Sequence, residues 1–170
     1  MTTVLVPTAL EPGHTSEVRE GLFYCQATYR LDAPPDRVLA ALTGDWDRWW
    51  TTGRREDVRV DDRGVTRWKF LPVRVTAPIV WFNIEMQPPR VDKNSAGQPE
   101  KIVLAMMLAG ACDGPACYEI YAAPGGGTLL RGSWNGVRPR GWRRLATGFL
   151  GQIHVMTERR AIANLARLAA

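Results

Sequence analysis

The chain has 170 residues, enough for one domain that buries roughly 70% of the surface its unfolded form exposes. Apolar residues make up 45% and charged residues 23%, a balance that excludes intrinsic disorder for most of the chain. The formal net charge of +5 is unevenly placed, because residues 131–170 hold eight Arg against Glu158 alone. Without a supporting motif, this basic end does not predict a nucleic-acid partner.

Nothing in the sequence indicates export or a membrane span. The longest apolar run, Ile102 to Cys112, is far shorter than the roughly 20 residues that a spanning helix needs. The first ten residues lack the basic start and apolar stretch of a signal peptide. The three cysteines are odd in number and form no C-x-x-C pair, which favours reduced thiols. We therefore expect a cytoplasmic protein.

The first thirty residues contain one clear strand. Residues 1–20 show little periodicity and are expected to be a tail or a loosely docked arm, with the domain spanning residues 21–170. From Phe23 to Leu31, apolar and mostly polar residues alternate, which predicts a half-buried strand.

Two short helices are expected next. The first begins at Pro35, because proline suits a first helical turn, and ends near Thr43. The second runs from Asp45 to Thr51. It places three tryptophans at i, i+3 and i+4 on one face, where they are expected either to cap a cavity or to pack on a sheet: Trp46, Trp49 and Trp50.

Residues 54–137 are expected to form short antiparallel strands separated by turns, about seven strands with the first one included. Pro72 and Pro78 bracket an irregular stretch, the strand after it covers Val80 to Met86, and residues 90–100 are expected to be a long exposed loop. If the even-numbered face looks inward, it lines the interior with Trp68, Phe82, Ile84, Met86, Leu104, Met106, Tyr118, Ile120 and Trp134.

From about Pro139 the apolar period becomes helical and continues to the end of the chain. The predicted inward stripe carries Trp142, Leu145, Phe149, Ile153 and Met156, with Arg160 one turn further on. His154 falls off this stripe and is expected to be structural. Gly148 and Gly151 lie inside the predicted helix, where each glycine destabilises the helix by roughly 1 kcal/mol relative to Ala. At least one of them is therefore expected to permit a close approach between the helix and a neighbouring group.

The order strand, two short helices, antiparallel strands and long C-terminal helix resembles the helix-grip fold of the START-like SRPBCC superfamily. Leu31-Asp32-Ala33-Pro34-Pro35-Asp36-Arg37-Val38 with Trp49-Trp50 resembles its opening, and the hairpin from Tyr118 to Leu130 resembles the strands that precede its last helix. The resemblance covers residues 21–170. It implies an α+β fold whose sheet curls around the helix, and a cavity of the kind that binds lipids or polyketides in other members.

The residue inventory excludes several enzyme classes. The two histidines, His14 and His154, do not stand at metal-ligand spacing from Cys or carboxylates, so no metal is expected. No phosphate-binding loop, dinucleotide fingerprint or serine nucleophile elbow is present, and no cofactor is expected.

These observations predict a protein that binds a small apolar molecule in an internal cavity. The expected ligand-binding residues are Trp50, Trp68, Phe82, Met86, Met106, Tyr118, Trp134, Phe149, Ile153, Met156 and Arg160. A polyketide aromatase or cyclase is the enzymatic alternative, which needs a polar group such as Tyr118, Thr128 or Arg160 deep in the cavity. A protein-interaction module, using the basic end of the chain, is a further alternative.

Overall fold

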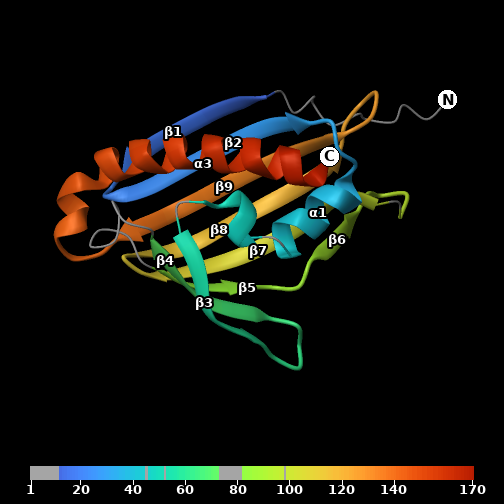
Figure 1. The fold of residues 1–170 in the computed structure, drawn as a ribbon. Helices are drawn as coiled ribbons and strands as arrows, with labels where there is room; N and C mark the ends of the chain where they lie inside the picture. Colours follow the sequence, from blue (N-terminus) through green and yellow to red (C-terminus); the bar gives the residue numbers. More distant parts are fainter. Residues whose placement is uncertain (1–11, 45, 52, 73–81, 98) are drawn as a thin grey trace.

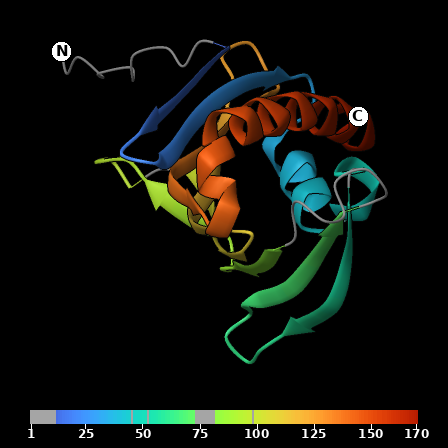
Figure 2. The ribbon, with the colours of Figure 1, turned by 90° about the vertical axis from the view of Figure 1, so that its left-hand side faces the viewer.

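The computed structural model describes residues 12–44, 46–51, 53–72, 82–97 and 99–170. Within these residues nine strands form one antiparallel sheet in the order β1-β2-β9-β8-β7-β5-β4-β3, with β6 pairing β7. Figures 1 and 2 show the sheet curving around α3 and α1, which lie on its concave side. The predicted α+β helix-grip architecture is confirmed.

The first half of the sheet is built around the predicted helices. The strands are β1 (Gly13–Arg19), β2 (Leu22–Leu31), β3 (Gly53–Val60) and β4 (Thr66–Pro72). Between β2 and β3 lie α1 (Pro35–Gly44), which buries Val38, Ala41 and Leu42, and α2 (Trp46–Trp49). The predicted helix start at Asp45 and the predictions for Pro78, Val80 and residues 1–11 lie outside the described residues.

The second half supplies the central strands and the long helix. The strands are β5 (Phe82–Met86), β6 (Arg90–Lys93), β7 (Pro99–Gly110), β8 (Cys112–Ala122) and β9 (Thr128–Pro139). A 3-10 turn, η1 (Gly141–Ala146), leads into α3 (Thr147–Ala169). Strand β7 is long enough to pair with β8 along one edge and with both β5 and β6 along the other. No helix among the described residues is long and apolar enough to cross a membrane.

Two local predictions need correction. Residues 13–19 of the expected tail or arm form edge strand β1, which pairs with β2 from Gly13↔Thr28 to Arg19↔Leu22. All of its side chains except His14 are exposed, so backbone pairing holds this strand and no apolar alternation marks it. The expected loop at residues 90–100 contains β6 and the start of β7, although its side chains are mostly exposed as predicted.

The interior lies between the concave sheet face and the helices. Alternation assigned this face correctly on the later strands. Trp134 is half-buried, and the other predicted inward residues are buried: Trp68, Phe82, Ile84, Met86, Leu104, Met106, Tyr118 and Ile120. From α3 the same core receives Ala161, Ile162, Leu165 and Ala169.

Candidate functional site

The short helix α2 places its tryptophans in the middle of the interior. Their rings pack edge to face or stacked on one another and on neighbours from the sheet: Trp46 and Trp49 have centroids 4.6 Å apart, and Trp46 lies 5.2 Å from Trp68 of β4. Trp49 also meets Tyr118 of β8 at 6.1 Å, and Trp50 lies 5.4 Å from Trp49. We call these five residues the aromatic cluster.

Three indole nitrogens of this cluster find no acceptor in the part of the chain that the structure describes. Nε1 of Trp46, Trp49 and Trp68 is buried and has no hydrogen-bond partner among the described residues. Buried indole N–H groups usually find a partner, and leaving such a donor unpaired costs about 1–3 kcal/mol. The aromatic cluster thus combines a large apolar surface with unused hydrogen-bond donors.

His154 of α3 extends the ring contacts toward the other end of the interior. Its imidazole lies 6.3 Å from Trp50 in a stacked arrangement and 3.8 Å from Trp134 of β9. Trp134 in turn contacts Phe23 at 6.2 Å and Phe82 at 6.4 Å. Burial lowers the pKa of His154 to about 3, so the ring is neutral at pH 7.

One turn further along α3, Glu158 points at the sheet. Its side chain is 1% exposed, and it accepts a hydrogen bond of 3.4 Å from the Tyr29 hydroxyl of β2. Its carboxylate lies over Gly132, where a Cβ would stand only 2.6 Å from Oε1. Burial raises the pKa of Glu158 to about 7 even though the Tyr29 hydrogen bond opposes this.

Cys25 of β2 completes a polar group under α3. The thiol sulfur of Cys25, a ring nitrogen of His154 and a carboxylate oxygen of Glu158 all lie within 4.8 Å of one another, and all three residues are buried. We call them the Cys–His–Glu cluster. Nε2 of His14 on β1 lies 3.3 Å from the Cys25 sulfur. Sequence spacing did not indicate that the histidines meet metal-ligating groups, but three separate elements bring them together here.

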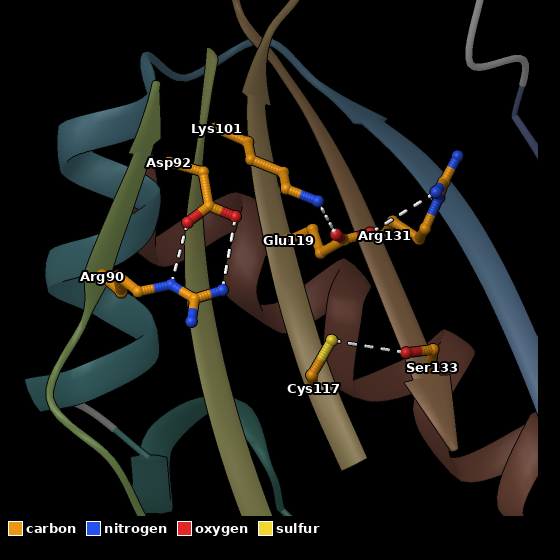
Figure 3. A network of polar contacts seen from close by, with 7 residues as sticks. All are labelled: Arg90, Asp92, Lys101, Cys117, Glu119, Arg131 and Ser133. Atoms are coloured by element: carbon orange, nitrogen blue, oxygen red, sulfur yellow. Dashed lines mark hydrogen bonds and ion pairs between the residues drawn. The ribbon is translucent and has the colours of Figure 1, made fainter. Parts of the chain in front are cut away.

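The opposite face of the sheet carries a different kind of polar network. Figure 3 shows Glu119 of β8 between Lys101 of β7 and Arg131 of β9, on the side of the sheet away from the helices. Burial is the largest single influence and would raise the pKa of Glu119, but the hydrogen bonds from Lys101 and Tyr121 and the charges of Lys101 and Arg131 together outweigh it, so the pKa falls below its ordinary value. These charges compensate one another, as expected for a structural surface network.

The sheet residues of the predicted site lie where the sequence placed them, whereas several helix residues do not. Trp68, Phe82, Met86, Met106 and Tyr118 are buried on the inner face, and Trp50 and Trp134 are half-buried against the core.

Residues of the predicted inward helix stripe are instead exposed: Trp142 by 59%, Leu145 by 94%, Phe149 by 66% and Met156 by 71%. Arg160 is also exposed, and Ile153 is half-buried. The prediction of Phe149, Met156 and Arg160 as cavity residues was wrong. The helix turns its other face inward, where smaller side chains such as Gly151 and Ala161 let it lie close to the sheet.

The polar part of the site was not predicted from the sequence. His154 and Glu158 stand at i and i+4 on one helical face, and two polar residues at this spacing usually indicate a solvent-facing side. The available signal was that Glu158 is the only acidic residue after Arg131. Among the polar residues considered for catalysis, Tyr118 faces the interior, whereas the Thr128 hydroxyl donates to the Ala33 carbonyl at 2.7 Å.

Comparison with solved structures identifies the fold. The human StarD13 (DLC2) lipid transfer and protein localization domain superposes with a TM-score of 0.64 at 15% identity, over 94% of this chain and 90% of that one. TTHA0849 from Thermus thermophilus also gives 0.64, at 10% identity, over 86% and 96%. A protein of unknown function, SA2116 from Staphylococcus aureus, gives 0.60 at 10% identity, over 95% and 96%.

No model of a known protein family matches the chain, and no curated protein matches its sequence. At these identities the structural likeness defines the fold. The chain has a START-like helix-grip fold, as the order of its elements predicted.

Proposed function

We propose that the protein binds a small hydrophobic molecule that carries at least one hydrogen-bond-accepting oxygen, and that it does so against the aromatic cluster between α2, α3 and the concave sheet face. The ligand's apolar body packs on the indole and phenol rings. Its oxygen accepts from the buried indole N–H groups. The observation that carries the proposal is that the buried indole N–H groups of Trp46, Trp49 and Trp68 find no acceptor within residues 12–44, 46–51, 53–72, 82–97 and 99–170.

A purely structural role explains the rings but not their nitrogens. Close packing of aromatic side chains needs no polar atom, and apolar side chains can bury comparable surface without leaving a donor unpaired. Three such donors at neighbouring positions match a ligand with a carbonyl, carboxyl or ester group, since these groups accept hydrogen bonds from more than one direction.

The fold supports the same proposal. The similar human domain is described as a lipid transfer and protein localization domain. Lipids combine a long apolar body with a few oxygens, which is the chemistry that the aromatic cluster accepts. Lipid transport, polyketide cyclisation and a cytoplasmic location remain predictions.

The test compares two tryptophan-to-phenylalanine variants. Trp49→Phe keeps an aromatic ring at a fully buried position and removes one N–H, whereas Trp142→Phe does the same at a position that is 59% exposed. Binding is measured with cis-parinaric acid, a fluorescent fatty acid, and with pyrene, a hydrocarbon without an acceptor. Trp49→Phe should weaken parinaric acid binding roughly 5-fold or more, because one hydrogen bond contributes about 1 kcal/mol.

The two variants are expected to affect the affinities for the two probes differently. Trp142→Phe should leave both affinities unchanged, and Trp49→Phe should weaken pyrene binding less than parinaric acid binding, because both probes lose the same ring surface and only parinaric acid also loses a hydrogen bond. Equal loss for both probes in Trp49→Phe would contradict the hydrogen-bonding part of the proposal. Failure of the unmodified protein to bind either probe, together with no organic molecule detected by native mass spectrometry, would contradict ligand binding itself.

A further inference from the structure

Four side chains with metal-binding atoms meet at the end of the interior that lies under α3 and next to the edge of the sheet. His14 comes from β1, Cys25 from β2, and His154 and Glu158 from successive turns of α3. The pairing of β1 with β2 puts His14 opposite Ala27, on the same face as Cys25. Strand register and helical spacing thus bring together residues from opposite ends of the chain.

The distances suit a small tetrahedral centre. Cys25 Sγ and His14 Nε2 are 3.3 Å apart, His154 Nε2 and Glu158 Oε2 are 3.7 Å apart, and the donor atoms of Cys25, His154 and Glu158 lie within 4.8 Å of one another. Bonds of about 2.0–2.3 Å at tetrahedral angles separate the ligand atoms of zinc by roughly 3.3–3.8 Å. Among Cys25, His154 and Glu158, side-chain adjustments of about an ångström would bring the widest pairs into this range, and His14 lies next to this group through its contact with Cys25.

The polar atoms of this group are poorly satisfied by the protein. His154 is 7% exposed and its Nε2 has no hydrogen-bond partner among the described residues, although the atom points toward the Glu158 carboxylate. Glu158 is buried, and its hydrogen bond from Tyr29 is long. Among the described residues, no Lys or Arg forms an ion pair with its carboxylate. Buried carboxylates and imidazoles without such partners carry a desolvation penalty.

We propose that Cys25, His154 and Glu158, with His14 as the fourth ligand, bind a divalent transition metal of the zinc type. A thiolate, a carboxylate and two neutral imidazoles are ligands that Zn²⁺ accepts. One thiolate and one carboxylate carry two negative charges, which balance the two positive charges of the ion. The complete centre is neutral, so it can be buried where either anion alone is unfavourable.

The surroundings provide second-sphere contacts and a route of entry. The Tyr29 hydroxyl donates to the Glu158 carboxylate and would orient it, as outer-sphere partners do at known metal sites. His14 lies on the edge strand and is only half-buried, so the ion can enter from the sheet edge. Binding would link β1, β2 and α3 and would stabilise the pairing of an edge strand whose other side chains are exposed.

The experiment uses the full chain, purified with chelator and titrated with Co²⁺ and then Zn²⁺. We expect one Co²⁺ per chain, with the visible bands of tetrahedral cobalt and a thiolate-to-cobalt charge-transfer band in the near ultraviolet, all displaced by one equivalent of Zn²⁺. Cys25→Ser should abolish the charge-transfer band. The matched control is Cys117→Ser, because Cys117 lies on the opposite face of the sheet, where its thiol is hydrogen-bonded to the Ser133 hydroxyl (Figure 3). This variant should keep the charge-transfer band.

A second measurement guards against a Cys25 variant that fails to fold. His14→Ala changes a half-buried edge residue and should leave the apo melting temperature nearly unchanged. Its affinity for Zn²⁺ should fall by more than the roughly 10–100-fold typical of outer-sphere changes. In the unmodified protein, Zn²⁺ at about a hundred times its Kd should raise the melting temperature by on the order of 5 °C or more.

The outcomes separate this proposal from ligand binding. A cobalt spectrum without a thiolate band, a band that survives in Cys25→Ser, or a Zn²⁺-induced melting shift that is equal in His14→Ala would overturn the metal site. None of these measurements involves the apolar probes, and Trp49→Phe should leave the cobalt spectrum intact. Failure of either proposal can therefore be recognised without reference to the other.

Discussion

The two glycines near the start of α3 give a sharp test of how that helix packs. An added Cβ at Gly151 would lie 2.5 Å from Cε2 and 3.0 Å from Cδ2 of Phe23, whereas a Cβ at Gly148 would meet nothing within 4 Å. Carbon atoms in favourable contact are about 3.5–4.0 Å apart, so Gly151→Ala requires a shift of about 1 Å. We therefore expect the two substitutions to change stability in opposite directions.

The magnitudes follow from the surroundings of the Phe23 ring. Phe23 is 6% exposed and has edge-to-face contacts with Trp134 and His154, so its ring has little room to move. Overpacking typically costs about 1–3 kcal/mol, and the gain in helix propensity offsets about 1 kcal/mol of it. Gly151→Ala should lower the melting temperature by about 3 °C, and Gly148→Ala should raise it by about 2 °C.

Denaturant and thermal unfolding of the two variants, side by side with the unmodified protein, measure this difference. Placing Gly151→Ala in a Phe23→Leu background should turn its effect from destabilising to neutral or stabilising, because the clashing ring is gone. If Gly151→Ala stabilises the protein as much as Gly148→Ala does, α3 does not approach β2 as closely as described, and the assignment of its inner face fails.

Two further substitutions test other parts of the fold. Thr128→Val should lower the free energy of unfolding by about 1–2 kcal/mol, since it leaves the buried Ala33 carbonyl without its donor, and Thr128→Ser should retain most of the stability. Glu119 has a folded pKa below its ordinary 4.5, so its contribution is complete above that pH and is lost as the pH falls through the folded pKa. The free energy of unfolding should therefore fall less steeply with decreasing pH in Glu119→Gln than in the unmodified protein. An unchanged pH profile would show that the Lys101–Glu119 pair does not stabilise the fold.

The sheet was predictable from the sequence because alternation reports directly on which side chains share a face. Residues such as Trp68, Ile84 and Tyr118 lie on the inner side of three strands as their even numbering predicted. Strand β1 was missed since its polar residues are held by backbone hydrogen bonds, which leave no trace in hydropathy.

For the long helix, periodicity grouped the right residues and assigned the wrong face. Phe149 and Met156 do share a stripe of α3, but it faces solvent, because the sheet leaves room for the smaller Gly151 and Ala161 on the inner side, and Leu145 of η1 is exposed as well. The convergence of Cys25, His154 and Glu158 depends on how a strand and a helix are docked, so sequence spacing alone could not reveal it.

The packing of the aromatic cluster also determines how the protein interacts with light. Trp46, Trp49, Trp50 and Trp68 have successive ring centroids 4.6 to 5.9 Å apart, well inside the range over which an excited indole passes its energy to a neighbour. These four rings therefore emit as one group, and an absorbing molecule or quencher that reaches any member dims them all. Trp142 is exposed to water, so its emission is expected to the red of theirs.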